Sequence, residues 1–394
     1  MKAFLIIISQ LLFPVVWFTV GSFWLGLATS ISLLILIYGI SALLIRYRVY
    51  VYDLSNYQQL PLFKGWTHRT IVMALAISPD NKYVASGEYS SKAYLWDIAS
   101  RRKVSKIVSC AAATPDTYSG SVSSITFSRD GRLFTGCSNG AIRAFDPESG
   151  KELLVIQAKA PIEALYLSDN DEKICTIEPL FKTRDGEIVH SIDNDRHTYS
   201  FGRYCMRFYS VASGKLAGAI NENDPFSAAA LTPNRQQLAA LHDHPEENNN
   251  TQTIIVYSMQ SGEELAAFTV SKSTGTVSIS FDVITASNEL IAIGGWKGEI
   301  RLYCLETDEL VRTISHEGDA RGILFSSDGK ILAVSIQYRH DDLAISLYDT
   351  NSGEELMKID DINSNWGLNM AFSPDGKLFT SAGVKKGEKT YGND

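Results

Sequence analysis

Histidine side chains are the residues of this chain best suited to chemistry, because several lie close together in polar stretches. A neutral imidazole is a preferred ligand of Zn²⁺. His242 and His244 are two residues apart, and His190 and His197 come before them. A zinc site, however, needs three or four converging ligands, each oriented by a further hydrogen-bond partner. Polar loops rarely provide this arrangement, so we expect these histidines to bind no metal.

Motifs of known enzyme classes are missing from the sequence. His316-Glu317 begins a zincin-like motif, but Ala320 stands where the second histidine ligand belongs. Neither the G-x-S-x-G turn of a serine hydrolase nor the G-x-x-x-x-G-K-[ST] loop that binds phosphate occurs. We therefore predict a protein that is not an enzyme and needs no cofactor.

The balance of charge argues against nucleic acid as a partner. The chain has 394 residues, with 36 Lys and Arg against 44 Asp and Glu and a formal net charge of −8. Lys2 is the single charged residue among residues 1–45, so the remainder has a net charge of −9. Binding to a phosphate backbone requires clustered cations, and no basic stripe is evident.

The cysteines predict neither a disulfide framework nor a zinc site. Their number is odd, their spacing is wide and no C-x-x-C occurs. We expect buried thiols in a reducing compartment. The five are Cys110, Cys137, Cys175, Cys205 and Cys304.

A long uncharged run near the N-terminus predicts a membrane anchor. Residues 3–45 hold no charged side chain, which is about twice the ~20 residues needed for one transmembrane helix. Gly21-Ser22 lies near the middle, so we expect a hairpin of two helices over 3–20 and 23–45. Lys2 precedes the run and Arg46 follows it, which puts both ends in the cytoplasm by the positive-inside rule. We expect an integral protein of the plasma or inner membrane, with the rest of the chain in the cytoplasm.

Two other interpretations of the uncharged run remain open. A cleaved signal peptide would also combine Lys2 with an apolar core, although no small-x-small cleavage site follows its first part. A single span with an interfacial first segment would leave the orientation undecided.

An aromatic residue that closes a strand-like run recurs seven times, and we call each an aromatic box. Successive boxes are about 45 to 50 residues apart, except for one longer step from Phe145 to Tyr209. Between them, apolar residues alternate with period two and turns such as Ser-Pro-Asp-Gly follow. A period of this size is typical of stacked units of four short strands. The boxes are Tyr52, Trp96, Phe145, Tyr209, Tyr257, Tyr303 and Tyr348.

These features resemble the WD-repeat β-propeller family. The resemblance covers about residues 47–390, although Trp96-Asp97 is the only literal Trp-Asp pair. It implies a structural hydrogen-bond network in which His68, Ser86 and Trp96 take part. Ser90 stands where the family has an aspartate, so we expect this network to be incomplete. A second network is expected in part from His316, Asp342 and Tyr348.

The number of repeats predicts an all-β, seven-bladed propeller over residues 46–394. Six complete units extend from about Lys64 to Ile359, and the tail from Asn369 supplies only two more strands. Residues 49–54 and 59–63 supply the missing third and fourth strands. A closing blade that is split between the two ends of the domain would close the ring and hide sheet edges.

Long insertions fall on the face of the ring that the resemblance identifies as the top. They lie at 111–120, 180–203, 242–251 and 337–342. Surface loops on a rigid scaffold commonly carry binding sites. The candidate partner-binding residues are Tyr118, Lys182, Arg184, His190, Arg203, His242, His244, Trp296, Tyr338 and Arg339.

We therefore expect a membrane-anchored, non-enzymatic scaffold that binds a protein, itself membrane-associated, through the top-face loops. Residues 3–45 contact the lipid bilayer in this interpretation. Two alternatives remain: a propeller hydrolase or oxidoreductase with its active site at the channel mouth, and an extracytoplasmic sensor or envelope assembly factor.

Overall fold

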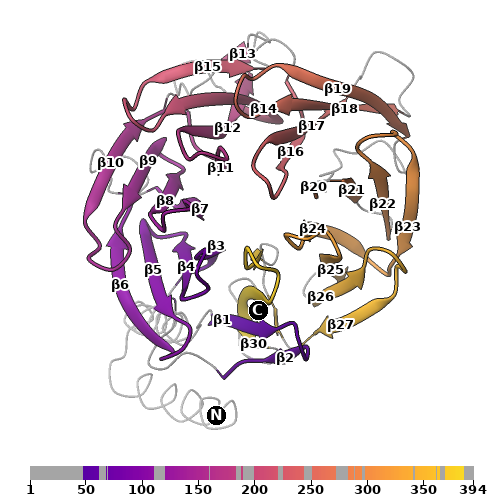
Figure 1. Cartoon of the computed structure of the whole chain (residues 1–394), viewed down its shortest axis with the longest axis horizontal. Helices are drawn as coiled ribbons and strands as arrows, with labels where there is room; N and C mark the ends of the chain where they lie inside the picture. Colours follow the sequence, from indigo (N-terminus) through magenta and orange to yellow (C-terminus); the bar gives the residue numbers. More distant parts are fainter. Residues whose placement is uncertain are drawn as a thin grey trace, which may run out of the picture. The chain divides into compact units, whose positions relative to one another are not determined.

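The strands form seven antiparallel sheets arranged as the blades of a closed ring (Figure 1). The all-β, seven-bladed propeller expected from the repeats is thus confirmed. The computed structural model describes residues 48–61, 68, 70–110, 120–158, 160–182, 188–189, 199–220, 225–243, 251–271, 283–287, 289–294, 298–339, 342–360, 362–363 and 369–385.

The first three blades each follow the chain in order from the inner to the outer strand. Blade 1 contains β3 (Val72–Ile77), β4 (Tyr83–Glu88), β5 (Lys92–Asp97) and β6 (Arg102–Val108). Blade 2 contains β7 (Val122–Phe127), β8 (Leu133–Cys137), β9 (Ala141–Phe145) and β10 (Glu152–Gln157). Blade 3 contains β11 (Ala164–Leu167), β12 (Lys173–Lys182), β14 (Tyr199–Ser210) and β15 (Leu216–Ile220), with β13 (Ile188–Val189) beside β12.

The next three blades repeat this order. Blade 4 contains β16 (Ala228–Leu231), β17 (Gln237–Asp243), β18 (Thr251–Ser258) and β19 (Glu264–Ser271). Blade 5 contains β20 (Val283–Ala286), β21 (Leu290–Gly294), β22 (Glu299–Cys304) and β23 (Leu310–Ser315). Blade 6 contains β24 (Asp319–Phe325), β25 (Ile331–Arg339), β26 (Asp342–Asp349) and β27 (Glu355–Ile359).

Blade 7 joins the two ends of the described chain. Its strands are β29 (Asn369–Phe372), β30 (Leu378–Lys385), β1 (Arg48–Asp53) and β2 (Gln58–Gln59), with β28 (Ile362–Asn363) beside the end of β30. β1 pairs with β30 over six residues, and the hydroxyl of Thr380 donates to the carbonyl of Tyr50 at 2.8 Å. The split closing blade is therefore present.

The outer strand of blade 7 is described only in part. We expected a strand over residues 59–63; β2 covers Gln58–Gln59, and residues 62 and 63 lie outside the described residues. The amide of Leu60 still donates to the carbonyl of Val51.

The hydrophobic core lies between successive blades. Blade 1 side chains such as Leu95 pack with Phe127 and Leu133 of blade 2. Tyr52 of blade 7 packs with Ile345 and Leu347 of blade 6 in the same manner. Each sheet therefore buries both faces against its neighbours, and no blade has a core of its own.

The turn between the two inner strands is held by side-chain hydrogen bonds in six blades. In blade 1 the hydroxyl of Ser78 donates to Asp80 at 2.6 Å and accepts the amide of Tyr83 at 2.8 Å. Such bonds fix a tight turn and explain why Ser or Thr precedes Asp or Asn by two residues. The other pairs are Ser128–Asp130, Ser168–Asn170, Thr232–Asn234, Ser326–Asp328 and Ser373–Asp375.

The outer strand of every blade from 1 to 6 has a β-bulge opposite its aromatic box. The strand pairing skips one residue at this point, and the extra residue bends the exposed edge. Bent edges discourage pairing with the edge of another chain. The skipped residues are Val104, Leu153, Ala217, Leu265, Val311 and Leu356.

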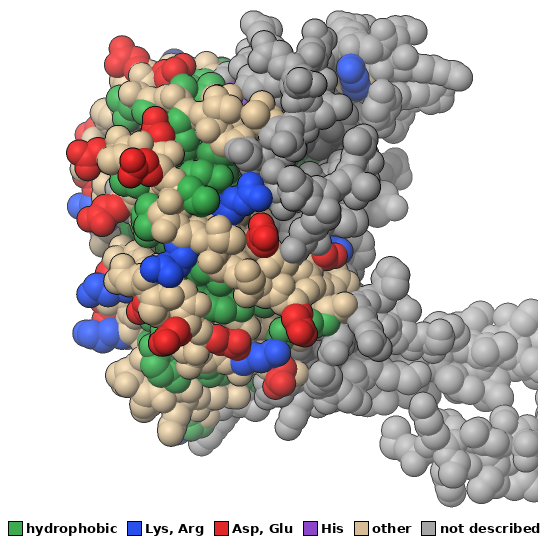
Figure 2. Space-filling model, turned by 90° about the vertical axis from the view of Figure 1, so that its right-hand side faces the viewer, with side chains coloured by type: hydrophobic (Ala, Val, Ile, Leu, Met, Phe, Trp, Pro, Cys, Tyr) green, Lys and Arg blue, Asp and Glu red, His purple; other side chains and the backbone are tan. Residues whose placement is uncertain are grey.

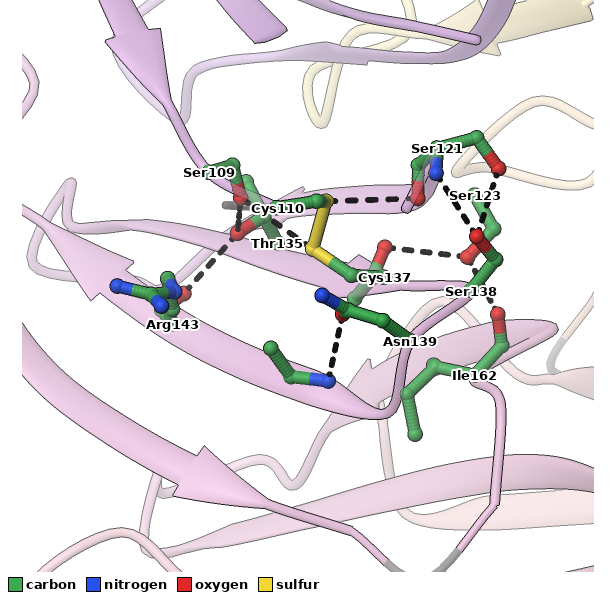
Figure 3. Close-up of a disulfide and its surroundings, with 12 residues drawn as sticks. Ser109, Cys110, Ser121, Ser123, Thr135, Cys137, Ser138, Asn139, Arg143 and Ile162 are labelled. Carbon is green, nitrogen blue, oxygen red and sulfur yellow. Dashed lines mark hydrogen bonds between the residues drawn. A yellow bond between two sulfur atoms is a disulfide. The ribbon is translucent and has the colours of Figure 1, made fainter. Parts of the chain in front are cut away.

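A disulfide joins Cys110 and Cys137, so the expectation of thiols alone is wrong (Figure 3). Cys110 follows β6 of blade 1, whereas Cys137 ends β8 of blade 2. Their Cα atoms are 5.8 Å apart and both side chains are fully buried. A sequence separation of 27 residues gave no sign of this pairing, because only the packing of successive blades brings the two residues together. Cys175 and Cys205 are buried thiols, and Cys304 is partly exposed.

The expected membrane hairpin over 3–20 and 23–45 lies outside the described residues. Among the residues that are described, no helix is long and apolar enough to cross a membrane. Residues 47–386 form one compact unit.

Candidate functional site

A chain of buried hydrogen bonds in blade 1 links His68, Ser86 and Trp96. The indole N–H of Trp96 donates to the hydroxyl of Ser86 at 2.8 Å, and this hydroxyl lies 3.1 Å from Nε2 of His68. Nδ1 of His68 lies 2.9 Å from a carboxylate oxygen of Glu88. Every member is at most 2% exposed. The residues connect the entrance of the blade to its two middle strands.

Glu88 supplies the carboxylate that the sequence analysis did not find. Ser90 occupies the aspartate position, but its hydroxyl donates to Glu88 at 2.5 Å. The expectation of an incomplete network is therefore wrong. Burial by itself raises the pKa of Glu88, but hydrogen bonds from His68 and Ser90 outweigh it and lower that pKa below 4.5. Glu88 lies two residues after Ser86 and hence on the same face of β4, a signal the sequence did contain.

Blade 3 has a related network in which arginine takes the place of histidine. Arg207 and Glu178 form an ion pair in which both side chains are at most 1% exposed. The hydroxyls of Thr176 and Tyr209 donate to the same carboxylate at 2.8 and 3.1 Å. Burial, and then repulsion by Glu178, raises the pKa of Tyr209. A charge buried in this way requires a partner and several hydrogen bonds.

One position of the second strand holds a buried reactive or polar residue in four successive blades. It is the fourth residue after the one that pairs with the aromatic box. Each occupant contacts a different partner: His68, Cys110, Arg207 and the ring of Phe226, respectively. The four occupants are Glu88, Cys137, Glu178 and His242.

Among the described side chains, no network joins His316 to Tyr348 in blade 6. Neither ring nitrogen of His316 has a hydrogen-bond partner among the described residues, and the same holds for the hydroxyl of Ser335. Burial lowers the pKa of His316. Tyr348 is buried in the core between blades 5 and 6. The side chain of Asp342 lies outside the described residues.

The candidate partner-binding residues have different surroundings. His242 is only 1% exposed and packs against Phe226, so it does not offer its ring to a partner as we expected. Lys182 and Arg203, in β12 and β14, are partly exposed. The ring of Tyr338 lies under the ammonium group of Lys358, 4.8 Å away. Tyr118, Arg184, His190, His244, Trp296 and the side chain of Arg339 lie outside the described residues.

The insertion at 180–203 is built partly as a sheet instead of the loop expected from its composition. β12 and β14 pair as far as Lys182 and Tyr199, beyond the end of the neighbouring strands of the blade. β13 adds to the same edge.

The described side chains form no group of three or more His, Cys, Asp or Glu suited to a metal ion. The possible zinc ligands His190, His197 and His244 lie outside the described residues. The polar groups that are buried in blades 1 and 3 bond to one another and leave no open coordination or reaction site between them.

A family model described as "WD domain, G-beta repeat" matches residues 59–97 and 108–146. These two segments end at Asp97 and Asp146, directly after the aromatic boxes of blades 1 and 2. The chain is a WD-repeat β-propeller. Family members typically mediate contacts between proteins.

Two curated proteins resemble this WD-repeat propeller over part of their length. Protein lethal(2)denticleless of Drosophila melanogaster is 38% identical over 52 residues, which are 13% of this chain and 7% of that protein. U3 small nucleolar RNA-associated protein 18 homolog of Homo sapiens is 25% identical over 163 residues, which are 41% of this chain and 27% of that protein. The chain thus matches less than a third of either relative.

Replacing Glu88 by Gln tests the blade 1 network. We expect the free energy of unfolding at pH 7 to fall by about 2 kcal/mol, the typical contribution of a hydrogen bond to a buried charge. Because folding lowers the pKa of Glu88, its stabilising effect is complete above pH 4.5 and is lost as the pH falls through the folded pKa. The difference in the free energy of unfolding between wild type and variant, measured with urea, should therefore become smaller below pH 4.5.

Glu152→Gln is the matched control, because Glu152 pairs with Arg143 near the surface and is 41% exposed. Its expected effect is at most about 1 kcal/mol. Equal effects of the two substitutions, or a difference for Glu88→Gln that does not change with pH, would contradict the network.

Proposed function

We propose that this protein is a membrane-anchored, non-enzymatic scaffold that binds another membrane-associated protein. The observation that carries the proposal is the direct continuation of the uncharged run 3–45 into β1, the strand that closes the ring. An interaction domain attached in this manner would hold its partner beside the bilayer. The typical role of WD-repeat propellers supports the choice of a protein as partner.

The end of the ring at which the chain enters also presents the insertions. Arg48 pairs with Gly383 near the end of β30, the second strand of blade 7. The segments between β12 and β14, between β17 and β18 and between β25 and β26 likewise follow second strands. They therefore leave the ring at the end of the blades at which β1 begins. We propose this end as the partner-binding face.

A role without nucleic acid is part of the same proposal. The name of the human relative associates that protein with U3 small nucleolar RNA. For this chain, the net charge of −8 opposes binding to a polyanion. The proposal also includes no cofactor.

Deleting residues 183–198 between β12 and β14 tests the binding face. The variant should recover at least about tenfold less of the partner from detergent-solubilised membranes, a loss of about 1.4 kcal/mol. Replacing Glu354 by Gln, in the exposed turn between β26 and β27 at the opposite end of the blades, is the control, and it should leave recovery unchanged. Quantitative mass spectrometry of affinity-purified complexes measures both. Undiminished recovery after deletion of 183–198, or absence of any specific partner, would contradict the proposal.

We propose that the propeller faces the cytoplasm, because Lys2, Arg46 and Arg48 flank the uncharged run. The Cys110–Cys137 disulfide is an observation against this side, since disulfides persist mainly in oxidising compartments. The side of the membrane therefore needs a direct experiment.

Labelling of an exposed cysteine from outside intact cells decides the side. Gln260→Cys places a thiol in the exposed turn before β19, in a Cys304→Ser background that removes the partly exposed native thiol. A membrane-impermeant maleimide should label the variant only after the cells are permeabilised. Labelling in intact cells would place the propeller outside the cytoplasm. The Cys304→Ser protein without the added cysteine is the control for background labelling.

A further inference from the structure

Charge is distributed unevenly around the circumference of the ring. Blade 1 has Arg101 in the turn before β6 and the exposed side chains of Arg102, Lys103 and Lys106 on β6 itself. No acidic residue lies in β6. Across the ring, the outer strands and preceding turns of blades 4 to 6 are acidic. Their exposed acidic residues are Glu263, Glu264, Glu306, Asp308, Glu309, Glu354 and Glu355.

The two charged sides lie on opposite parts of the ring. In Figure 1, β6 is at the left and β23 at the right. Figure 2 looks at the right-hand side, and acidic side chains predominate among the charged groups visible there. The basic edge of blade 1 is thus a local feature of a domain that is acidic as a whole.

The cations of β6 are not neutralised within the described part of the chain. No described carboxylate forms an ion pair with Arg101, Arg102, Lys103 or Lys106. By contrast, Lys82 pairs with Glu148 and Arg143 pairs with Glu152 on neighbouring elements. The ammonium group of Lys103 lies 5.4 Å from the centroid of the Tyr94 ring. Exposed cations without an ion pair are available to an external anion.

Exposed apolar side chains lie among these cations. Val104, the bulged residue of β6, is 42% exposed and Val108 at the end of the strand is 57% exposed. Tyr89, which follows β4, is 55% exposed. Lys92 pairs with Val108, which places the end of β6 beside the connection that contains Tyr89. Cations mixed with aliphatic and aromatic groups suit the boundary between headgroups and acyl chains.

We propose that this surface, the β6 edge (Arg102, Lys103, Val104, Lys106, Val108 and Tyr89), docks onto anionic lipid headgroups of the bilayer that holds residues 3–45. The inference rests on the proposed membrane anchor. Only residues 46 and 47 lie between the uncharged run and β1, so the chain from residue 45 to residue 48 spans at most about 11 Å. Blade 1 is in direct contact with blade 7, since the Asn369 amide donates to the Val72 carbonyl at 2.6 Å. The β6 edge therefore belongs to the blade next to the one that the chain enters after the uncharged run.

The proposal is tested on the full-length chain by comparing lipid contact at the bulged residues of β6 and β23. Val104→Cys in β6 and Val311→Cys in β23 occupy the same position in their blades and are 42% and 52% exposed in the wild type. Each variant, in the Cys304→Ser background, is labelled with an environment-sensitive fluorophore and reconstituted into vesicles that contain spin-labelled lipid. In phosphatidylglycerol-containing vesicles at low salt, quenching at position 104 should be several-fold greater than at position 311.

Charge reversal provides the second part of the test. Arg102→Glu, Lys103→Glu and Lys106→Glu together should abolish the excess quenching at position 104, as should vesicles of phosphatidylcholine alone. High salt should weaken it, because exposed charges are screened. Equal quenching at positions 104 and 311 would overturn the proposal, as would excess quenching that survives charge reversal. An unchanged thermal unfolding midpoint shows that the triple variant is folded.

Alkaline carbonate extraction of the same preparations distinguishes a failure of the membrane anchor from a failure of the lipid contact at the β6 edge. Release of the chain overturns the anchor and, with it, the bilayer as the occupant of the β6 edge. Retention together with equal quenching overturns only the lipid contact of β6. Binding of RNA to the edge together with equal quenching at positions 104 and 311 would assign the edge to a nucleic acid and overturn the proposal.

Discussion

The pairing of β1 with β30 is the constraint on which the propeller depends. Six residues from the beginning of the domain complete a sheet that starts near its end. Without them, β30 would present a free edge open to other chains. The Tyr52 and Phe379 rings, with centroids 6.1 Å apart, would also lose their contact. Since each blade is stabilised mainly by its neighbours, a defect in blade 7 exposes blades 1 and 6 as well.

Within the closed ring, blades 1 to 3 each link the same position of the second strand to a partner, but they use different residues to do so. Glu88 is held by His68 in blade 1, whereas Glu178 is held by Arg207 at the same position of blade 3. In blade 2 the position is Cys137, and the partner is attached covalently. A buried carboxylate or a disulfide at this position ties the second strand to another part of the chain in each of these three blades.

The sequence was sufficient for the architecture because the period and the turns repeat in almost every blade. The position of Tyr52, without inner strands of its own, was enough to predict the split blade. Contacts between blades were harder to predict: Cys110 and Cys137 meet only through packing, and Glu88 takes a role expected at position 90. His242 was expected at the surface because of its polar neighbours, but it is the last residue but one of β17, whose alternation turns the side chain inward. The polarity of the histidine did not indicate that its side chain points into the core.

Hydrogen exchange of the full-length protein, followed by mass spectrometry, tests ring closure most directly. If β1 completes blade 7, the amides of Arg48–Asp53 should exchange as slowly as those of β4 in the middle of blade 1. The slow exchange should be shared by β30, because the two strands open together. Rapid exchange in Arg48–Asp53 while β4 stays protected would show that the ring is open at this blade and would contradict the account.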